Sequence, residues 1–244
     1  MSRRWTLILA SLLVTSACGT HEKAPGQPVE DSEPIPPAKV LDFAFLYGRN
    51  CAGCHGENGH GGAAIGLGDP VYLAIADDAA ITRVTAGGVP GTAMPAFAQR
   101  SGGMLTDGQI NAIVRGIRSH WAKPEVLRGA SPPPYAASQS GDAQRGAGVY
   151  ATFCLSCHGP NGTGGVRAGS IVDRAYLELV SDQGLRTIVI AGRPDWGAPD
   201  WRGDAPGRSM APQDVSDVVA WLSAQRPALL GQPYSSAQIR GGVR

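Results

Sequence analysis

The sequence predicts an all-α protein built from two tandem copies of one small helical domain. Residues 47–62 align without a gap to residues 150–165, and both segments contain the pattern C-x-x-C-H followed by a glycine-rich run. Each copy closes with a stretch whose apolar residues recur at i, i+3, i+4 and i+7, the period of an amphipathic helix. Together these observations indicate that a whole domain is duplicated.

The C-x-x-C-H pattern carries the chemistry, and it occurs at residues 51–55 and 154–158. Two thiols one helical turn apart can bond to the vinyl groups of a porphyrin, and the adjacent histidine can bind the iron. Two copies therefore predict two covalently bound haem c groups. A redox dithiol or half of a zinc site also uses C-x-x-C, but zinc needs further Cys or His at matched spacing, which neither copy has.

The first domain, residues 38–122, is expected to begin with a helix that leads into Cys51. One apolar stripe of this helix is expected to face the closing helix, and it consists of Leu41, Ala44, Phe45 and Gly48. A glycine-rich loop at 56–68 and short helices at 70–76 and 78–86 follow. Thr106 and Gln109 have the spacing of a capping box, which predicts that the closing helix begins there and continues to Trp121.

The second domain, residues 141–226, repeats this order. Middle helices are predicted at 173–179 and 185–191, and Pro212 suits the first turn of the closing helix. Residues 123–140 form a proline-rich linker, partly extended, that is expected to run along the domain surfaces.

The order of helix with C-x-x-C-H, glycine-rich loop, methionine loop and closing helix resembles the class I cytochrome c domain, over roughly residues 38–226. The resemblance implies one haem c per domain, attached through both cysteines, with a histidine and a methionine as the two iron ligands. The implied cofactor-binding residues are Cys51, Cys54, His55, Met94, Cys154, Cys157, His158 and Met210.

Met94 is favoured as the first distal ligand because it precedes Pro95 and aligns with Met210 of the second copy. Met104 is the rival candidate; it lacks a counterpart in the second copy and is interpreted as a packing residue. His60 is expected to be exposed to solvent. His120 is expected to complement the dipole at the end of the closing helix.

Residues 1–17 are typical of a bacterial lipoprotein signal peptide, because Arg3 and Arg4 precede an apolar stretch too short to span a bilayer. Small residues precede Cys18, which predicts lipidation there and accounts for the one cysteine that the haem signals leave over. Ordinary cleavage with a free thiol is the alternative. Residues 18–37 are predicted to be a disordered tether, and 227–244 a tail that is either surface-bound or disordered.

The resemblance implies a membrane-tethered dihaem cytochrome c in the bacterial cell envelope, lipid-anchored through Cys18 and facing the periplasm or the outside. It would transfer single electrons between a quinol-oxidising complex or periplasmic dehydrogenase and a terminal oxidase, reductase or reaction centre. The expected partners are redox proteins. No nucleic acid is expected, since the formal net charge is only +1, and no small-molecule substrate.

Two other functions stay open. The same haems could belong to a fixed subunit of a larger respiratory or photosynthetic complex, or to a dihaem peroxidase-type enzyme. A peroxidase-type enzyme needs an unoccupied axial position on one iron, and a His/Met ligand pair occupies both axial positions. We therefore expect this protein to have no catalytic activity.

Extra residues before Met210 contain a doubled Pro-Asp-Trp, ending at Trp196 and Trp201. The favoured interpretation is a longer loop whose indoles pack on their own domain. The alternative is that they cover a haem edge or form a docking patch.

Overall fold

The computed structural model describes residues 34–203 and 208–226, and within these ranges it contains helices, two isolated β-bridges and no β-strand. The all-α prediction is confirmed. The signal peptide, Cys18, most of the tether and the tail at 227–244 lie outside the described residues. None of the helices in the described ranges is both long and apolar enough to cross a membrane.

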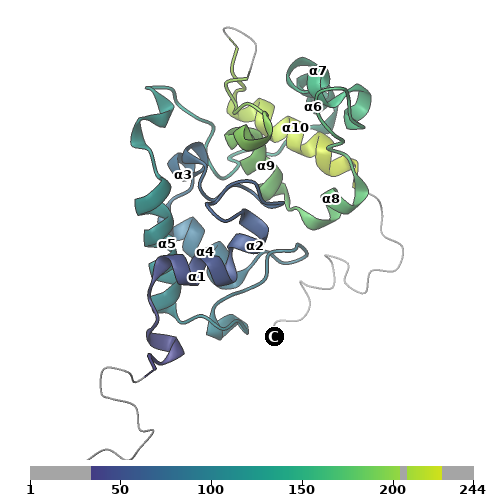
Figure 1. Ribbon diagram of the computed structural model, residues 1–244. Coiled ribbons are helices and arrows are strands. Elements are labelled where there is room, and N and C mark those ends of the chain that lie inside the picture. The colour runs from purple at the N-terminus through teal and green to yellow at the C-terminus, as the bar shows by residue number, and fades with distance from the viewer. Residues whose placement is uncertain (1–33, 204–207, 227–244) are drawn as a thin grey trace, which may run out of the picture. The chain divides into compact units, whose positions relative to one another are not determined.

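The helices of the two repeats follow one another in the predicted order (Figure 1). In the first repeat they are η2 (Pro37–Lys39), α1 (Phe43–Asn50), α2 (Ala52–His55), α3 (Pro70–Ile75), α4 (Asp78–Gly87), η3 (Gln99–Ser101) and α5 (Asp107–Trp121). The linker contains η4 (Pro124–Leu127), and the second repeat contains α6 (Ala143–Phe153), α7 (Leu155–His158), η5 (Pro160–Gly162), α8 (Arg174–Leu179), α9 (Asp182–Ala191), η6 (Pro194–Trp196) and α10 (Pro212–Ala224).

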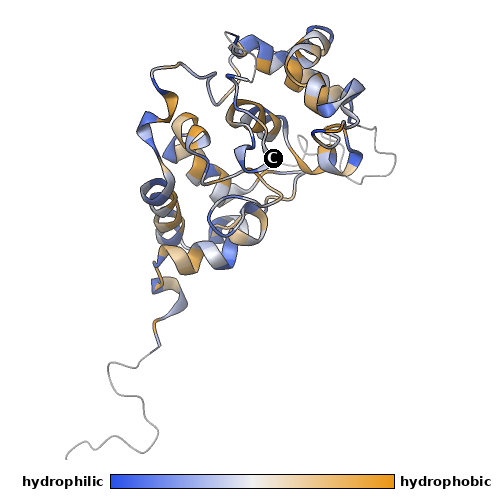
Figure 2. Cartoon of the chain, turned by 45° about the horizontal axis from the view of Figure 1, so that its top comes forward, coloured by the Kyte–Doolittle hydropathy of each residue, from blue (hydrophilic) through white to orange (hydrophobic). Residues whose placement is uncertain are grey.

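The closing helix of each repeat begins where local sequence signals place it. Thr106 and Gln109 form the predicted capping box of α5, each accepting a hydrogen bond from the other's backbone N–H. Pro212 is the first residue of α10. Hydrophobic and hydrophilic residues lie side by side on the helices, as expected for amphipathic elements (Figure 2).

The first helix of each repeat packs against the closing helix, α1 on α5 and α6 on α10. The predicted contact face of α1 was wrong, because Leu41 and Phe45 are 51% and 52% exposed. Phe43, Leu46 and Tyr47 have the same helical spacing, and Leu46 and Tyr47 are the buried pair. The larger stripe buries more apolar area, so it takes the inner face.

A glycine lies at the close approach of each of these helix pairs. A Cβ at Gly116 of α5 would lie 2.0 Å from Cδ2 of Phe43 on α1. In the second repeat the glycine is on the other helix: a Cβ at Gly146 of α6 would lie 2.1 Å from the backbone oxygen of Asp217 and 2.8 Å from the Cβ of Trp221, both on α10. Phe43 lies four residues before Tyr47, and Gly146 lies four residues before Tyr150, so they occupy equivalent positions of the two repeats. The large residue and the glycine have therefore changed places between the first helix and the closing helix.

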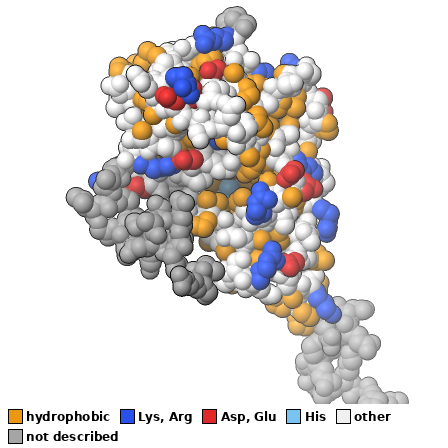
Figure 3. Space-filling view, turned by 180° about the vertical axis from the view of Figure 1, so that it is seen from behind, with side chains coloured by type: hydrophobic (Ala, Val, Ile, Leu, Met, Phe, Trp, Pro, Cys, Tyr) orange, Lys and Arg blue, Asp and Glu red, His pale blue; other side chains and the backbone are white. Residues whose placement is uncertain are grey.

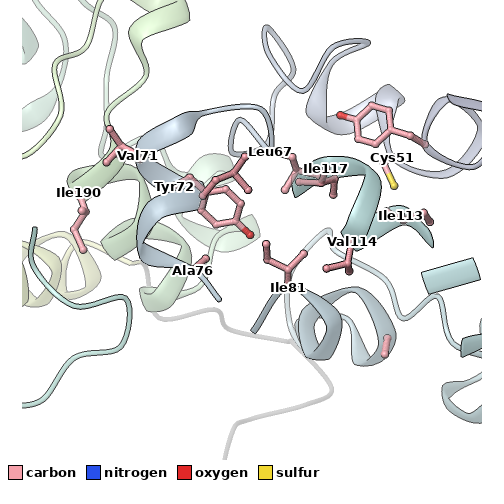
Figure 4. Packing of buried hydrophobic residues seen from close by; sticks show 14 of the residues in the cluster. Cys51, Leu67, Val71, Tyr72, Ala76, Ile81, Ile113, Val114, Ile117 and Ile190 are labelled. Atoms are coloured by element: carbon pink, nitrogen blue, oxygen red, sulfur yellow. The ribbon is translucent and has the colours of Figure 1, made fainter. Parts of the chain in front are cut away.

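One hydrophobic cluster includes residues of both repeats. Val71 of α3 and Ile190 of α9 lie near each other in Figure 4, and α3 contacts α9. The linker contacts the second repeat: the guanidinium of Arg186 donates to the carbonyl of Pro134 at 2.9 Å, and the amide of Gln183 donates to that of Tyr135 at 2.8 Å. The linker therefore runs along a domain surface, as expected.

Candidate functional site

The first C-x-x-C-H segment forms a single helical turn, α2, directly after α1. Cys51 is its N-cap residue, and the Cys51 carbonyl accepts the backbone N–H of His55 at 3.0 Å. Cys51 is buried and Cys54 is exposed, and no disulfide joins them. One turn thus brings together the two cysteines and the histidine that the sequence predicted to act together.

The ring of His55 is held in one orientation. Its Nδ1 lies 2.8 Å from the carbonyl oxygen of Ile65, so Nδ1–H donates and Nε2 keeps its lone pair. Nε2 is buried and has no hydrogen-bond partner among the described residues. Burial, the largest cause, lowers the pKa of His55 and favours the neutral ring. A buried, neutral nitrogen without a partner is what an iron ligand requires, so the residues present fit a haem.

The second C-x-x-C-H segment has the same geometry. α7 follows α6 with Cys154 as N-cap, and the Cys154 carbonyl accepts the backbone N–H of His158 at 2.9 Å. Nδ1 of His158 lies 2.8 Å from the carbonyl oxygen of Gly169. His158 is more exposed than His55, so the second site is the more open one.

The first cysteine of each turn has a raised thiol pKa. Burial, followed by the charge of the second cysteine, raises the pKa of Cys51 to about 12 and that of Cys154 to about 11.

A tyrosine and a glycine complete each C-x-x-C-H turn, and sequence reasoning did not single them out. The hydroxyl of Tyr47 donates to the carbonyl of Gly56 at 2.8 Å, and that of Tyr150 donates to the carbonyl of Gly159. Gly56 and Gly159 have φ values of +85° and +70°, which L side chains rarely adopt. The available signal was that both residue types recur at equivalent positions of the two repeats.

A tryptophan from the closing helix packs on each of these tyrosines. The ring centroids of Tyr47 and Trp121 are 4.9 Å apart, and those of Tyr150 and Trp221 are 4.3 Å apart. The hydroxyl of each tyrosine is thereby aimed at the residue after the histidine.

The methionines differ in burial. Met210 is 9% exposed, and its backbone N–H donates to the carbonyl of Trp201 at 2.8 Å. Met94 is partly buried in the loop after α4. Met104 is 80% exposed, so its interpretation as a packing residue was wrong; the neighbouring Leu105 is the residue that is buried there. Iron ligation by Met94 and Met210 stays a prediction.

The other two histidines of the described residues, His60 and His120, lie where they were expected. His60 is exposed. His120 is in the last turn of α5, and its ring stacks on Phe43 with centroids 4.9 Å apart.

The two tryptophans of the extra segment have different surroundings, so neither interpretation holds for both. Trp201 is 2% exposed and packs in its own repeat, whereas Trp196 is 63% exposed. The guanidinium of Arg193 lies 3.9 Å from the ring centroid of Trp196.

The same segment contacts the first repeat. The guanidinium of Arg193 donates to the carbonyl of Gly62 at 2.8 Å, and the carboxylate of Asp195 accepts the backbone N–H of Gly61 at 2.8 Å. The two side chains also pair with each other at 3.0 Å. This contact has no signal in the repeat pattern, because the segment has no counterpart in the first repeat.

Comparison with known families places a cytochrome domain in each half of the chain. Residues 38–115 match the family described as cytochrome c oxidase, cbb3-type, subunit III. Residues 143–225 match the family described as cytochrome c.

Curated relatives extend across both halves. The cytochrome bc1 complex cytochrome c subunit of Mycobacterium tuberculosis is 30% identical over 192 residues, which are 75% of this chain and 62% of that protein. The cbb3-type cytochrome c oxidase subunit FixP of Azorhizobium caulinodans is 30% identical over 189 residues, 70% of this chain and 58% of that protein. The chain spans less than two thirds of the length of these relatives.

Among solved structures, a chain of the Kuenenia stuttgartiensis reducing HAO-like protein complex aligns with a TM-score of 0.43 and 16% identity, over 76% of this chain and 96% of that chain. That score is too low to inform the fold or the function. The two family matches and the duplicated C-x-x-C-H turns agree with each other, and the chain belongs to the dihaem c-type cytochromes, with two cytochrome c domains in tandem.

Proposed function

We propose that this protein carries single electrons between redox proteins of a respiratory chain, using one haem c in each of the domains 38–122 and 141–226. The observation that carries the proposal is the repeated histidine geometry: Nδ1 of His55 and of His158 each lie 2.8 Å from a backbone carbonyl oxygen. In both repeats Nε2 is therefore left with its lone pair, as an iron ligand needs.

In this proposal Cys51, Cys54, Cys154 and Cys157 form the thioether bonds, His55 and His158 are the proximal ligands, and Met94 and Met210 are the distal ligands. A bound haem c supplies a one-electron ferric/ferrous couple. The chain contributes rigid ligands: α2 and α7 hold the cysteines, and the backbone carbonyls fix the imidazoles. With both axial positions filled, no site is left for oxygen or peroxide.

The proposed location is the bacterial cell envelope, with the domains facing the periplasm or the outside and a lipid on Cys18. The sequence of residues 1–18 supports this. A lipid tether would confine the protein near membrane-bound partners and raise their effective concentration.

The proposed partners are a quinol-oxidising complex or periplasmic dehydrogenase as donor and an oxidase, reductase or reaction centre as acceptor. On the face seen in Figure 3, side chains of both charge signs are interspersed with hydrophobic ones. Docking on such a face would combine apolar contacts with individual ion pairs rather than use one uniformly charged ring.

A fixed subunit of a respiratory complex is the second candidate, favoured by the names of the relatives, a bc1 complex cytochrome c subunit and a cbb3-type oxidase subunit. Purification of the tagged protein in mild detergent separates the two. A stoichiometric partner that stays bound through a salt wash identifies a subunit, and a free dihaem protein identifies a carrier.

A redox titration of the purified protein, followed by its absorption spectrum, tests the electron-transfer function. We expect two one-electron components and the weak red band that methionine gives when bound to ferric haem. Met94→Ala and Met210→Ala should each remove half of that band. One low-potential component with half of the band in the unaltered protein would instead favour the peroxidase-type enzyme. Loss of half of the band in Met104→Ala would show that Met94 is not the ligand.

A further inference from the structure

The second repeat contacts the first at a loop that surrounds His55. Asp195 accepts the backbone N–H of Gly61, and Arg193 donates to the carbonyl of Gly62, each at 2.8 Å. The side chains of Arg193 and Asp195 are only 9% and 13% exposed. A paired, largely buried arginine and aspartate thus bind two consecutive residues of the other domain.

That loop leads directly to the proximal ligand. The backbone N–H of Ala64 donates to the carbonyl of Cys54 at 2.9 Å, and Ile65 provides the carbonyl that accepts from His55. Gly62 lies against the same turn, since a Cβ there would be 2.2 Å from the carbonyl oxygen of Cys54. A shift of Gly61 and Gly62 would therefore be passed on to the imidazole.

The equivalent loop of the second repeat is held differently. Gly164, the counterpart of Gly61, donates its N–H to the carbonyl of His158 at 2.8 Å, and Gly165 donates to that of Ala168 at 2.8 Å. These bonds lie within the second repeat. The loop of the first repeat is instead contacted by two charged side chains of the other domain.

The pair also acts on the site through its charges. The hydrogen bond from Arg193 is the main cause that lowers the pKa of Asp195, so its carboxylate stays ionised. Through Gly62, the guanidinium of Arg193 is hydrogen-bonded to the loop whose Ile65 carbonyl holds the His55 ring. One positive and one negative charge, both shielded from water, are therefore close to the first site.

We propose that Arg193 and Asp195 are positioning residues through which the second domain sets the reduction potential of the haem in the first domain. This inference rests on the proposed function, because it requires haem bound at His55. A nearby positive charge disfavours the ferric form and raises the potential, whereas a carboxylate lowers it.

Single substitutions that remove one charge each test the inference. We expect Arg193→Gln to lower the ferrous-to-ferric ratio of the first haem, at fixed applied potential, by about three- to tenfold, and Asp195→Asn to raise it by a similar factor. Tenfold corresponds to about 59 mV for a one-electron couple. The Met210→Ala variant identifies which component of the titration belongs to the second haem. The ferrous-to-ferric ratio of that haem should stay within twofold of its value in the unaltered protein.

The opposite signs separate a charge effect from simple loosening of the loop. Both variants lose bonds to the loop, so hydrogen exchange at Ala64 and Ile65 should rise in both. Shifts of the same sign, or no shift in a protein that holds both haems, would overturn the inference. If Arg193→Gln does not fold, Arg193→Lys, which keeps the charge, replaces it. The ferrous-to-ferric ratio of the first haem must then stay within twofold in Arg193→Lys and still rise in Asp195→Asn. Any other result also overturns the inference.

Arg202 provides a matched control from the second Pro-Asp-Trp. It pairs with Asp200 and lies 4.7 Å from the ring centroid of Trp201, as Arg193 pairs with Asp195 beside Trp196. However, Arg202 donates to the linker carbonyl of Val126 at 3.3 Å instead of to the first haem loop. Arg202→Gln should leave the ferrous-to-ferric ratio of each haem within twofold of its value in the unaltered protein. Absence of two titrating haems in the unaltered protein would contradict the proposed function itself, independently of these variants.

Discussion

At the scale of single residues, the tyrosines before the C-x-x-C-H turns hold the backbone directly after His55 and His158. The hydroxyl of Tyr47 bonds the carbonyl of Gly56, whereas its ring packs on Trp121. The hydroxyl and the ring therefore have separate roles that one conservative substitution can distinguish.

Tyr47→Phe should lower the free energy of unfolding by about 1–2 kcal/mol, because it leaves the Gly56 carbonyl without its donor and keeps the ring. Denaturant unfolding of the haem-loaded protein measures this. Tyr176→Phe is the control, since no hydrogen bond of the Tyr176 hydroxyl to another described residue is present. Equal losses in both variants would contradict a specific role for Tyr47.

Asp217 links the first and last helices of the second repeat. Its side chain is 4% exposed and accepts hydrogen bonds from Arg145 and from the backbone N–H of Asp142. The bond from Arg145 is the largest cause that lowers the pKa of Asp217, from 3.8 to about 2. Because the folded-state pKa is lower than the unfolded one, ionised Asp217 stabilises the fold above about pH 4, and this contribution is lost as the pH falls towards 2.

Asp217→Asn should therefore reduce the free energy of unfolding by about 1–2 kcal/mol at pH 6, a range that allows for the solvent-exposed Arg145 partner. The difference between the two proteins should shrink as the pH is lowered to about 2.5. Urea unfolding at a series of pH values measures it. A difference that stays constant over this range would refute the role of the carboxylate.

At the scale of helices, the exchanged large and small residues make each helix pair specific. The ring of Phe43 occupies the space above Gly116, whereas the backbone of Asp217 and the Cβ of Trp221 lie against Gly146. Gly116→Ala should destabilise the protein by about 1–3 kcal/mol through the clash with Phe43.

The double variant Phe43→Gly with Gly116→Trp reproduces the arrangement of the second repeat, so it should lose less stability than the sum of the two single changes. Gly48→Ala on α1 is the control, because a Cβ there has no atom within 4 Å. Additive losses in the double variant would mean that the two residues are not coupled.

Local signals predicted the helices well and their contact faces poorly. The capping box at Thr106 and the proline at Pro212 are short-range features, and α5 and α10 begin where they indicated. The inner face of α1 could not be read in the same way. In a helix of 8 residues, apolar side chains occupy two sides, and only the shape of α5 decides between them.

At the scale of the whole molecule, the linker is part of the packed structure. Arg186 is 3% exposed, and it donates to the carbonyls of Pro134 and Tyr135 and to the hydroxyl of Ser216. Arg186→Met keeps much of the side-chain volume but loses these bonds.

Proteolysis within residues 130–139 should be about tenfold faster in the haem-loaded variant than in the unaltered protein. This corresponds to a decrease of about 1.4 kcal/mol in the free energy of local unfolding of the linker. The control is Arg174→Met, which removes an exposed ion pair with Glu178. An unchanged rate in Arg186→Met would show that the linker is held by other contacts.

Sequence reasoning reached the duplication, the helical class and the C-x-x-C-H turns because the evidence for each lies within a few neighbouring residues or in the repeat itself. It missed the contact of Arg193 with Gly62, which joins residues 131 positions apart and comes from a segment without a repeat partner. The exposure of Trp196 and burial of Trp201 were likewise undecidable, since both follow the same Pro-Asp dipeptide.

The exchanged glycines have a consequence for how the chain acquires its fold. Two homologous domains on one chain can mispair, with the first helix of one docking on the last helix of the other. Here α1 would bring Phe43 against Trp221, two large side chains in one space, and α6 would bring Gly146 against Gly116, leaving a gap. Each first helix thus fits its own closing helix better than that of the other domain, which favours correct pairing of the helices as the chain folds.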